Sequence, residues 1–129
     1  MKYQIACAAL ALLSSAPAFA QEEPTSPVTV SGSVALVSDY RFRGVSMTDK
    51  GAAVQGGITA THESGAYAGA WASNLSGWGT FGGPNLELDL FAGYAFPLGE
   101  NATLDVGLTW YMYPSGADET DFAEPYVKL

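Results

Sequence analysis

Residues 86–96 read LELDLFAGYAF, and in this stretch large apolar side chains alternate with polar or small ones. Three leucines occupy even positions, and Glu87 and Asp89 stand between them. A period of two is typical of a β-strand with one apolar and one polar face, because successive side chains point to opposite sides. The stretch therefore predicts a strand that separates an apolar environment from a polar one.

The same alternation recurs along the chain, strongly over residues 28–43 and 103–113 and more weakly over 52–61 and 67–74. In the strong segments every charged residue lies on the polar face. Stretches rich in Gly, Pro, Asn, Asp and Ser, the residues that favour turns, separate these segments. They occupy residues 44–51, 63–66, 76–85, 97–101 and 114–121, and their lengths alternate between long and short. We expect an all-β, antiparallel up-and-down meander of five strands. A sixth strand is expected over 122–129, a stretch interrupted by Pro125 and Lys128.

The first 20 residues have the pattern of a cleavable signal peptide. Lys2 gives a positive start, residues 5–13 are apolar, and 18–20 read AFA, the small-x-small form of a cleavage site. The apolar run is shorter than the roughly 20 residues that span a bilayer. Residues 21–27 are polar and Pro-rich, so we expect a flexible lead-in followed by one β-domain over 28–129. The chain's single Cys, Cys7, would leave with the signal peptide.

Composition excludes several classes of function. The chain has 13 acidic and 5 basic residues and a net charge of −8, which argues against a general nucleic-acid binder. Its hydrophobic fraction of 48% is too high for a disordered acidic tail. An exported chain without disulfides needs another source of stability, and a lipid environment is one.

A soluble β-sandwich would also alternate apolar with polar residues, so the period alone does not decide. A lipid-facing surface explains why the apolar face carries no charge. Aromatic residues gather near the ends of the predicted strands, as in the interfacial girdles of membrane barrels. These predicted interface aromatics are Tyr40, Phe42, Tyr67, Tyr94, Phe96, Trp110 and Tyr113. Together these features favour a transmembrane β-barrel.

Residues 37–46 read VSDYRFRGVS and are followed by Thr48-Asp49 and Gln55-Gly56-Gly57. This block resembles the TorF family of proteins, which are exported proteobacterial β-barrel proteins classed as porins. Shorter matches follow at residues 62–65 (HESG), 71–74 (WASN), 86–89 (LELD), 93–94 (GY), 111 and 113–114. The resemblance implies a porin-like barrel in the outer membrane of a Gram-negative bacterium. It supplies no catalytic or ligand residues. Met47 departs from the pattern, because a polar residue is expected there.

The expected number of strands is too small to close a barrel in a membrane. Lipid-embedded strands cannot leave backbone groups unpaired, and the smallest single-chain bacterial barrels have about 8 strands. Members of the family that the chain resembles continue past this point with further strands. We therefore expect a partial barrel, truncated at its C-terminus. A barrel assembled from several chains is the alternative.

The chain offers little for catalysis or metal binding. His62 is the only His, and its neighbours Glu63 and Ser64 would suit a hydrolytic set, but a polar residue beside a short turn explains them as well. Asp118, Glu119, Asp121 and Glu124 could attract divalent cations, although their spacing is not that of an EF-hand. Trp78 and Phe81 could contact a ligand or lie at the membrane interface. We predict no enzyme activity, cofactor or metal site.

The remaining charged constellation would face the lumen of a barrel. Its members are Asp39, Arg41, Arg43, Glu87, Asp89 and Asp105. They would either line a pore and select ions or form salt bridges that fill a narrow interior. We predict passive diffusion of small polar solutes or ions, and the acidic excess favours cations. The alternative is a non-conducting barrel with a structural or surface-interaction role; a lipid-modifying enzyme rests on His62 alone. Expected partners are the bilayer, lipopolysaccharide and the barrel-assembly machinery, with homo-oligomerisation as a further option.

Overall fold

The computed structural model describes residues 26–77, 83–116 and 119–129, and these residues form strands, turns and loops without a helix. Six long strands form one antiparallel sheet. They are β1 (Val28–Val37), β4 (Ala53–His62), β5 (Ala66–Asn74), β6 (Leu86–Pro97), β7 (Thr103–Met112) and β8 (Phe122–Lys128). The predicted signal peptide, and the lead-in up to residue 25, lie outside the described residues.

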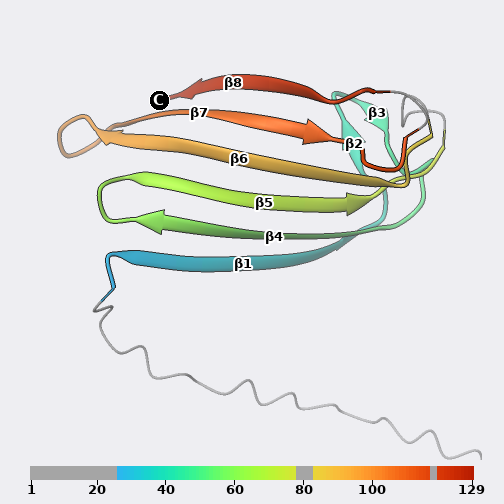
Figure 1. The fold of residues 1–129 in the computed structure, drawn as a ribbon, viewed down its shortest axis with the longest axis horizontal. Coiled ribbons are helices and arrows are strands. Elements are labelled where there is room, and N and C mark those ends of the chain that lie inside the picture. The colour runs from blue at the N-terminus through green and yellow to red at the C-terminus, as the bar shows by residue number, and fades with distance from the viewer. Residues whose placement is uncertain (1–25, 78–82, 117–118) are drawn as a thin grey trace, which may run out of the picture.

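The sheet is an up-and-down meander, with the order β1-β4-β5-β6-β7-β8 (Figure 1). The connections over residues 63–65 and 98–102 are short and lie at one end of the sheet. The chain leaves and re-enters the sheet for the long connections at the other end, between Val37 and Ala53, Asn74 and Leu86, and Met112 and Phe122. The all-β antiparallel prediction and the alternation of loop lengths are therefore confirmed. The predicted sixth strand is β8, which pairs with β7 at an edge of the sheet, where Pro125 is tolerated.

Strand register sorts the side chains onto two faces. One row runs Ser31, Thr59, Gly69, Phe91, Thr109 and Glu124 across the sheet, and the face that it marks is called the polar face. The next row runs Val30, Ala60, Ala68, Ala92, Leu108 and Pro125, and it marks the apolar face. Every Asp, Glu, Lys and Arg within the six long strands lies on the polar face.

The first predicted strand was too long. The alternation of residues 28–43 predicted one strand, but β1 ends at Val37 and the chain turns back on itself. Two short strands, β2 (Arg41–Phe42) and β3 (Val45–Ser46), pair around Arg43 and Gly44. Both of these residues have positive φ, 50° and 86°, as in the type I′ turn that suits a tight hairpin. Residues 39–48 are called the inner hairpin below.

Glycines on the polar face make room for aromatic rings on the neighbouring strand. Directly opposite partners are Gly57 and Trp71, Gly69 and Phe91, Gly93 and Tyr67, and Gly107 and Tyr126. A Cβ at Gly69 would lie 2.4 Å from the Phe91 ring and 2.5 Å from the backbone oxygen of Ile58. The rings therefore lie flat over backbone that has no side chain. This arrangement resembles the aromatic cover of strand glycines used in designed sheets.

A small cluster of buried hydrophobic side chains lies over the polar face, at the end of the sheet where the long loops are. Met47, Leu75 and Tyr113 form the buried cluster, and Tyr40, Phe42, Tyr111 and Phe122 pack against it. Met47, which departs from the expected polar residue, is fully buried there. None of the described segments is a helix with the length and apolar character needed to cross a bilayer.

Candidate functional site

A cavity of about 470 Å³ opens on the polar face over β4 to β8. Three charged side chains, Asp105, Glu124 and Lys128, line it together with hydroxyls and aromatic rings. The remaining lining residues are Thr59, Tyr67, Phe91, Thr109, Tyr111, Pro125 and Tyr126. The cavity thus combines carboxylates, hydroxyls and one ammonium group on a single wall, which suits water, ions and small polar solutes.

Asp105 is the predicted lumen residue that the structure places in this cavity. The hydroxyl of Tyr67 donates a hydrogen bond of 2.5 Å to Asp105 Oδ1, and it also contacts the hydroxyl of Tyr126. These three side chains come from β5, β7 and β8 and form a network across the sheet. The network orients the Asp105 carboxylate and leaves it beside the open space.

Glu87 and Asp89, two other predicted lumen residues, lie on the polar face but are covered. Their exposed fractions are 1% and 8%. Glu87 Oε1 accepts a hydrogen bond of 2.7 Å from the Tyr40 hydroxyl, whereas Glu87 Oε2 and Asp89 Oδ1 are buried without a hydrogen-bond partner. No ion pair found among the described residues reaches these carboxylates. Since a buried, unpaired carboxylate is costly, this pair is a strained feature of the fold.

The two tyrosines beside this pair remain protonated. Burial, followed by the hydrogen bond to Glu87, raises the pKa of Tyr40 above its usual value. Burial and the negative charges of Glu87 and Asp89 raise the pKa of Tyr113 as well. Both phenols therefore stay neutral at physiological pH. Tyr40 is thus available as a donor to the carboxylate below it.

Asp39, Arg41 and Arg43 lie in the inner hairpin and not in a long strand. Arg41 Nε donates to Asp39 Oδ2 at 2.7 Å, and Ser46 Oγ donates to Asp39 Oδ1 at 2.6 Å. The hydrogen bond from Ser46, with help from Arg41, lowers the pKa of Asp39 despite some desolvation. Arg43 reaches out of the hairpin and pairs with Glu124 on β8. The six predicted lumen residues therefore divide into a hairpin group, a buried pair and one cavity residue.

The predicted interface aromatics also divide between the faces. Tyr94, Phe96 and Trp110 lie on the apolar face, and Tyr94 packs against Phe96 with ring centroids 4.5 Å apart. Tyr67 instead points to the polar face. Tyr113 belongs to the buried cluster at the long-loop end, and Tyr40 and Phe42 pack against that cluster. An interfacial position stays a prediction for the first three and does not fit the contacts of the other four.

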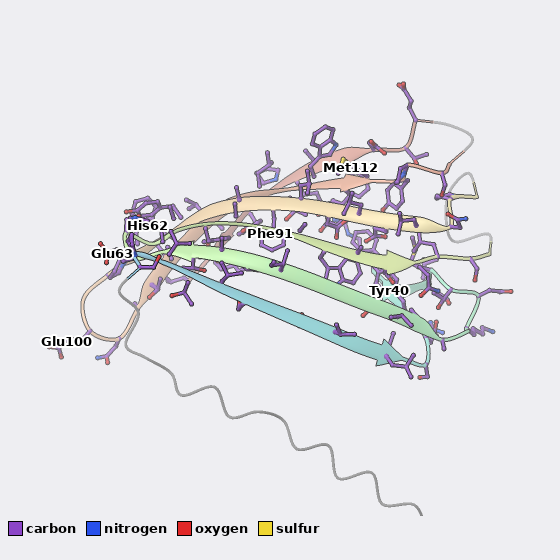
Figure 2. The ribbon with its side chains drawn as sticks, turned by 60° about the horizontal axis from the view of Figure 1, so that its bottom comes forward. Tyr40, His62, Glu63, Phe91, Glu100 and Met112 are labelled. Carbon is purple, nitrogen blue, oxygen red and sulfur yellow. The ribbon has the colours of Figure 1, made fainter. Side chains whose placement is uncertain are left out.

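His62 lies at the short-turn end of the sheet, whereas Tyr40 lies at the opposite end (Figure 2). Its Nδ1 accepts a hydrogen bond of 3.1 Å from the Ser64 backbone and lies 2.9 Å from the Ser64 hydroxyl. These contacts join residues two apart, as expected for a local turn. They bring no carboxylate to the ring.

Asp121 and Glu124, two residues of the predicted acidic stretch, have different partners. Asp121 Oδ1 accepts a hydrogen bond of 2.9 Å from the Tyr113 backbone, and Glu124 pairs with Arg43. Asp118, Trp78 and Phe81 lie outside the described residues. Within residues 26–77, 83–116 and 119–129, no group of three or more His, Cys, Asp or Glu side chains is arranged to hold a metal ion.

The residues that tie the hairpin to the sheet were not predicted from the sequence. Trp71 on β5 meets Tyr40 edge-on with centroids 5.5 Å apart, and Phe122 on β8 stacks on Tyr111 at 4.6 Å. The alternation of side chains could have indicated three aromatic residues of the polar face, because Tyr67, Trp71 and Tyr111 occupy the positions in β5 and β7 that point to this face. The fold-back of residues 39–48 had no such signal, and the contacts depend on it.

Comparison with known proteins gives one result for the family. No curated protein and no solved structure shows a significant similarity to the chain. A family model described as "bacterial protein of unknown function (Gcw_chp)" matches residues 21–129, which include every strand of the sheet. The chain therefore belongs to this bacterial family of unknown function.

Proposed function

We propose that the chain forms part of the wall of an outer-membrane β-barrel related to the TorF-family porins, and that its polar face lines a lumen for passive diffusion of small polar solutes or ions. In this proposal the chain is exported by its signal peptide and inserted by the barrel-assembly machinery. It catalyses no reaction. The bilayer and the lipopolysaccharide of the outer leaflet surround its apolar face.

The observation that carries the proposal is the uncovered apolar face. Val34 is 83% exposed, Leu36 76% and Ile58 56%, although all three belong to long strands. Other apolar-face residues that are at least 40% exposed are Val28, Val30, Val54, Leu90, Phe96, Leu108, Trp110 and Val127. No second layer covers them in the part of the chain that the structure describes. In water this contiguous apolar surface would be a strong liability, whereas in hydrocarbon it is favourable.

The polar face has the properties of a lumen wall. Two carboxylates, on Asp105 and Glu124, border the open cavity, against the ammonium group of Lys128. An excess of negative charge along a pore attracts cations and repels anions. The proposal therefore includes a preference for cations, exerted chiefly by Asp105, because Glu124, the other carboxylate that borders the cavity, is paired with Arg43.

Closure of the barrel requires partners for two strands. β1 and β8 form the edges of the sheet, and open edges are not tolerated in hydrocarbon. Since the six strands alternate in direction, β1 and β8 are antiparallel to each other. Added strands, from a longer chain or from a second copy, could therefore continue the meander on both sides. When the chain is reconstituted alone, further copies of it supply those strands.

Conductance across a planar bilayer tests the proposed diffusion. With the reconstituted chain in a KCl gradient, we expect channel events and a reversal potential that favours K⁺. Asp105→Asn should lower the ratio of K⁺ to Cl⁻ permeability by about twofold or more, because it removes one full charge from a confined lumen.

Glu63→Gln is the matched control. It removes one negative charge from the short turn outside the long strands, and it should leave the permeability ratio unchanged. Inserted protein that never conducts would contradict diffusion and favour the non-conducting structural barrel. A ratio that responds equally to both variants would contradict the role of Asp105.

A further inference from the structure

The inner hairpin lies across the polar face instead of extending away from the sheet. From its first arm, the Tyr40 ring contacts Trp71 on β5 and its hydroxyl bonds Glu87 on β6. Nearer its turn, Phe42 meets Tyr111 on β7 and Phe122 on β8, with centroids 5.7 Å and 6.5 Å apart. The hairpin therefore touches side chains of four neighbouring strands. Figure 1 shows its strands β2 and β3 at the long-loop end of the sheet.

Backbone hydrogen bonds fix the base of the hairpin. Met47 N donates to the Tyr40 carbonyl at 2.7 Å, which closes the hairpin, and Ser76 N donates to the Met47 carbonyl at 2.9 Å. A bridge between Thr48 and Ser76 adds to this attachment. With Met47 fully buried between hairpin and sheet, the fold-back is a packed element rather than a loose surface loop.

We infer that the inner hairpin is the constriction of the proposed pore, and that its tip residue Arg43, paired with Glu124, is a selectivity-determining residue. This inference rests on the proposed diffusion. The hairpin adjoins the open cavity, because Tyr111 and Glu124 line the cavity and also contact Phe42 and Arg43. A solute that passes along the polar face of β7 and β8 therefore meets the hairpin tip.

At the depth of the hairpin, the charges that a passing ion meets are those of Arg43 and its partner Glu124, and not those of Glu87 and Asp89. Glu87 and Asp89 are buried below Tyr40 and are withdrawn from a passing ion. The Arg43 side chain is 67% exposed and that of Glu124 34% exposed, so both can act on an ion in the open space. Opposite charges that face each other across a narrow passage set its ion preference.

Thiol labelling tests whether the hairpin covers the polar face, independently of conduction. In a Cys7→Ser background, Ser73→Cys places a thiol at a position that is 1% exposed and directly opposite Glu87. Thr59→Cys places one in the open cavity. A charged, membrane-impermeant thiol reagent should label position 73 at least about tenfold more slowly than position 59, because a buried thiol reacts only after local opening.

Replacement of residues 40–47 by two glycines, in each of these backgrounds, removes the contacts of Tyr40 and Phe42, the buried Met47 side chain and the Arg43 pair. Labelling at position 73 should then approach the rate at position 59, which itself should not change. Equal labelling rates at positions 73 and 59 in protein with the intact hairpin would contradict the claim that the hairpin covers the polar face. An unchanged rate at position 73 after the replacement would contradict it as well.

Conductance tests the constriction itself. The same replacement, in the chain without introduced thiols, should raise the single-channel conductance by about twofold or more, as expected when an obstruction leaves a narrow lumen. Arg43→Ala should increase cation preference, whereas Arg41→Ala, which removes a cation bonded to Asp39 within the hairpin, should change it less. Channels with unchanged conductance after the replacement would overturn the constriction and leave the proposed diffusion intact. Failure of every variant to conduct would overturn both.

Discussion

Ile58→Lys is expected to weaken folding into lipid vesicles by about 2–4 kcal/mol, the cost of a Lys at the midplane on the lipid face of a barrel. Ile58 lies near the middle of β4 on the apolar face and is 56% exposed. In the proposed membrane position its side chain meets acyl chains, and an ammonium group there would lose its hydration. The free energy of folding, from denaturant titrations of vesicle-bound protein, measures the effect.

The neighbouring residue provides the control. Thr59 lies on the same strand one position later, and it faces the cavity. Thr59→Lys introduces the same charge at the same depth but into a polar space, so we expect a small effect. Leu108 and Thr109 form a second pair of this kind on β7. Equal costs at the two positions of each pair, or a larger cost on the polar face, would contradict the assignment of the faces.

The second large effect is expected at Gly69. A methyl group at this position would lie 2.5 Å from the Ile58 carbonyl oxygen, which belongs to the neighbouring strand and cannot move aside without disturbing the ladder. It would also displace the Phe91 ring, which covers Gly69 from β6. Overpacking of this kind costs about 1–3 kcal/mol, so Gly69→Ala should lower the free energy of unfolding by that amount.

Gly56→Ala is the matched comparison, because we expect it to raise the free energy of unfolding where Gly69→Ala lowers it. It lies on the apolar face of β4, where an added Cβ would meet only the Ser33 carbonyl oxygen at an ordinary 3.5 Å. Gly56→Ala should stabilise by about 0.5–1 kcal/mol, because Ala has less backbone freedom than Gly to lose on folding. Thermal or denaturant unfolding of both variants in the same detergent makes the comparison. Equal effects of the two substitutions would contradict the aromatic–glycine packing.

The long strands could be predicted because their signal is local. In β6 and β7 the apolar and polar positions alternate over ten residues or more, and each strand pairs with its neighbour along the chain. A period of two, turn residues and short connections suffice to specify a meander of this kind. The same alternation is enough to assign Glu87, Asp89 and Asp105 to one face from the sequence alone.

The inner hairpin could not be predicted from alternation. Tyr40 and Phe42 continue the period of β1 as if the strand went on, and Arg43 is an unusual residue for positive φ. Gly44 was the only local sign of a tight turn. The fold-back is stabilised by partners far along the chain, such as Glu87 for Tyr40 and Glu124 for Arg43. Local sequence patterns therefore could not predict that Glu87 and Asp89 are buried. For this reason the open cavity contains Asp105 but not the other two predicted lumen carboxylates.

Tryptophan fluorescence in bilayers of brominated lipid tests the central claim most directly. Trp110 lies on the apolar face and is 48% exposed, whereas Trp71 lies on the polar face beside Tyr40. With Trp110 as the sole tryptophan (Trp71→Phe and Trp78→Phe), lipid bromine should quench most of the emission. With Trp71 as the sole tryptophan (Trp78→Phe and Trp110→Phe), it should quench little. Strong quenching of Trp71, or none of Trp110 in vesicle-bound protein, would contradict the claim that the apolar face meets hydrocarbon.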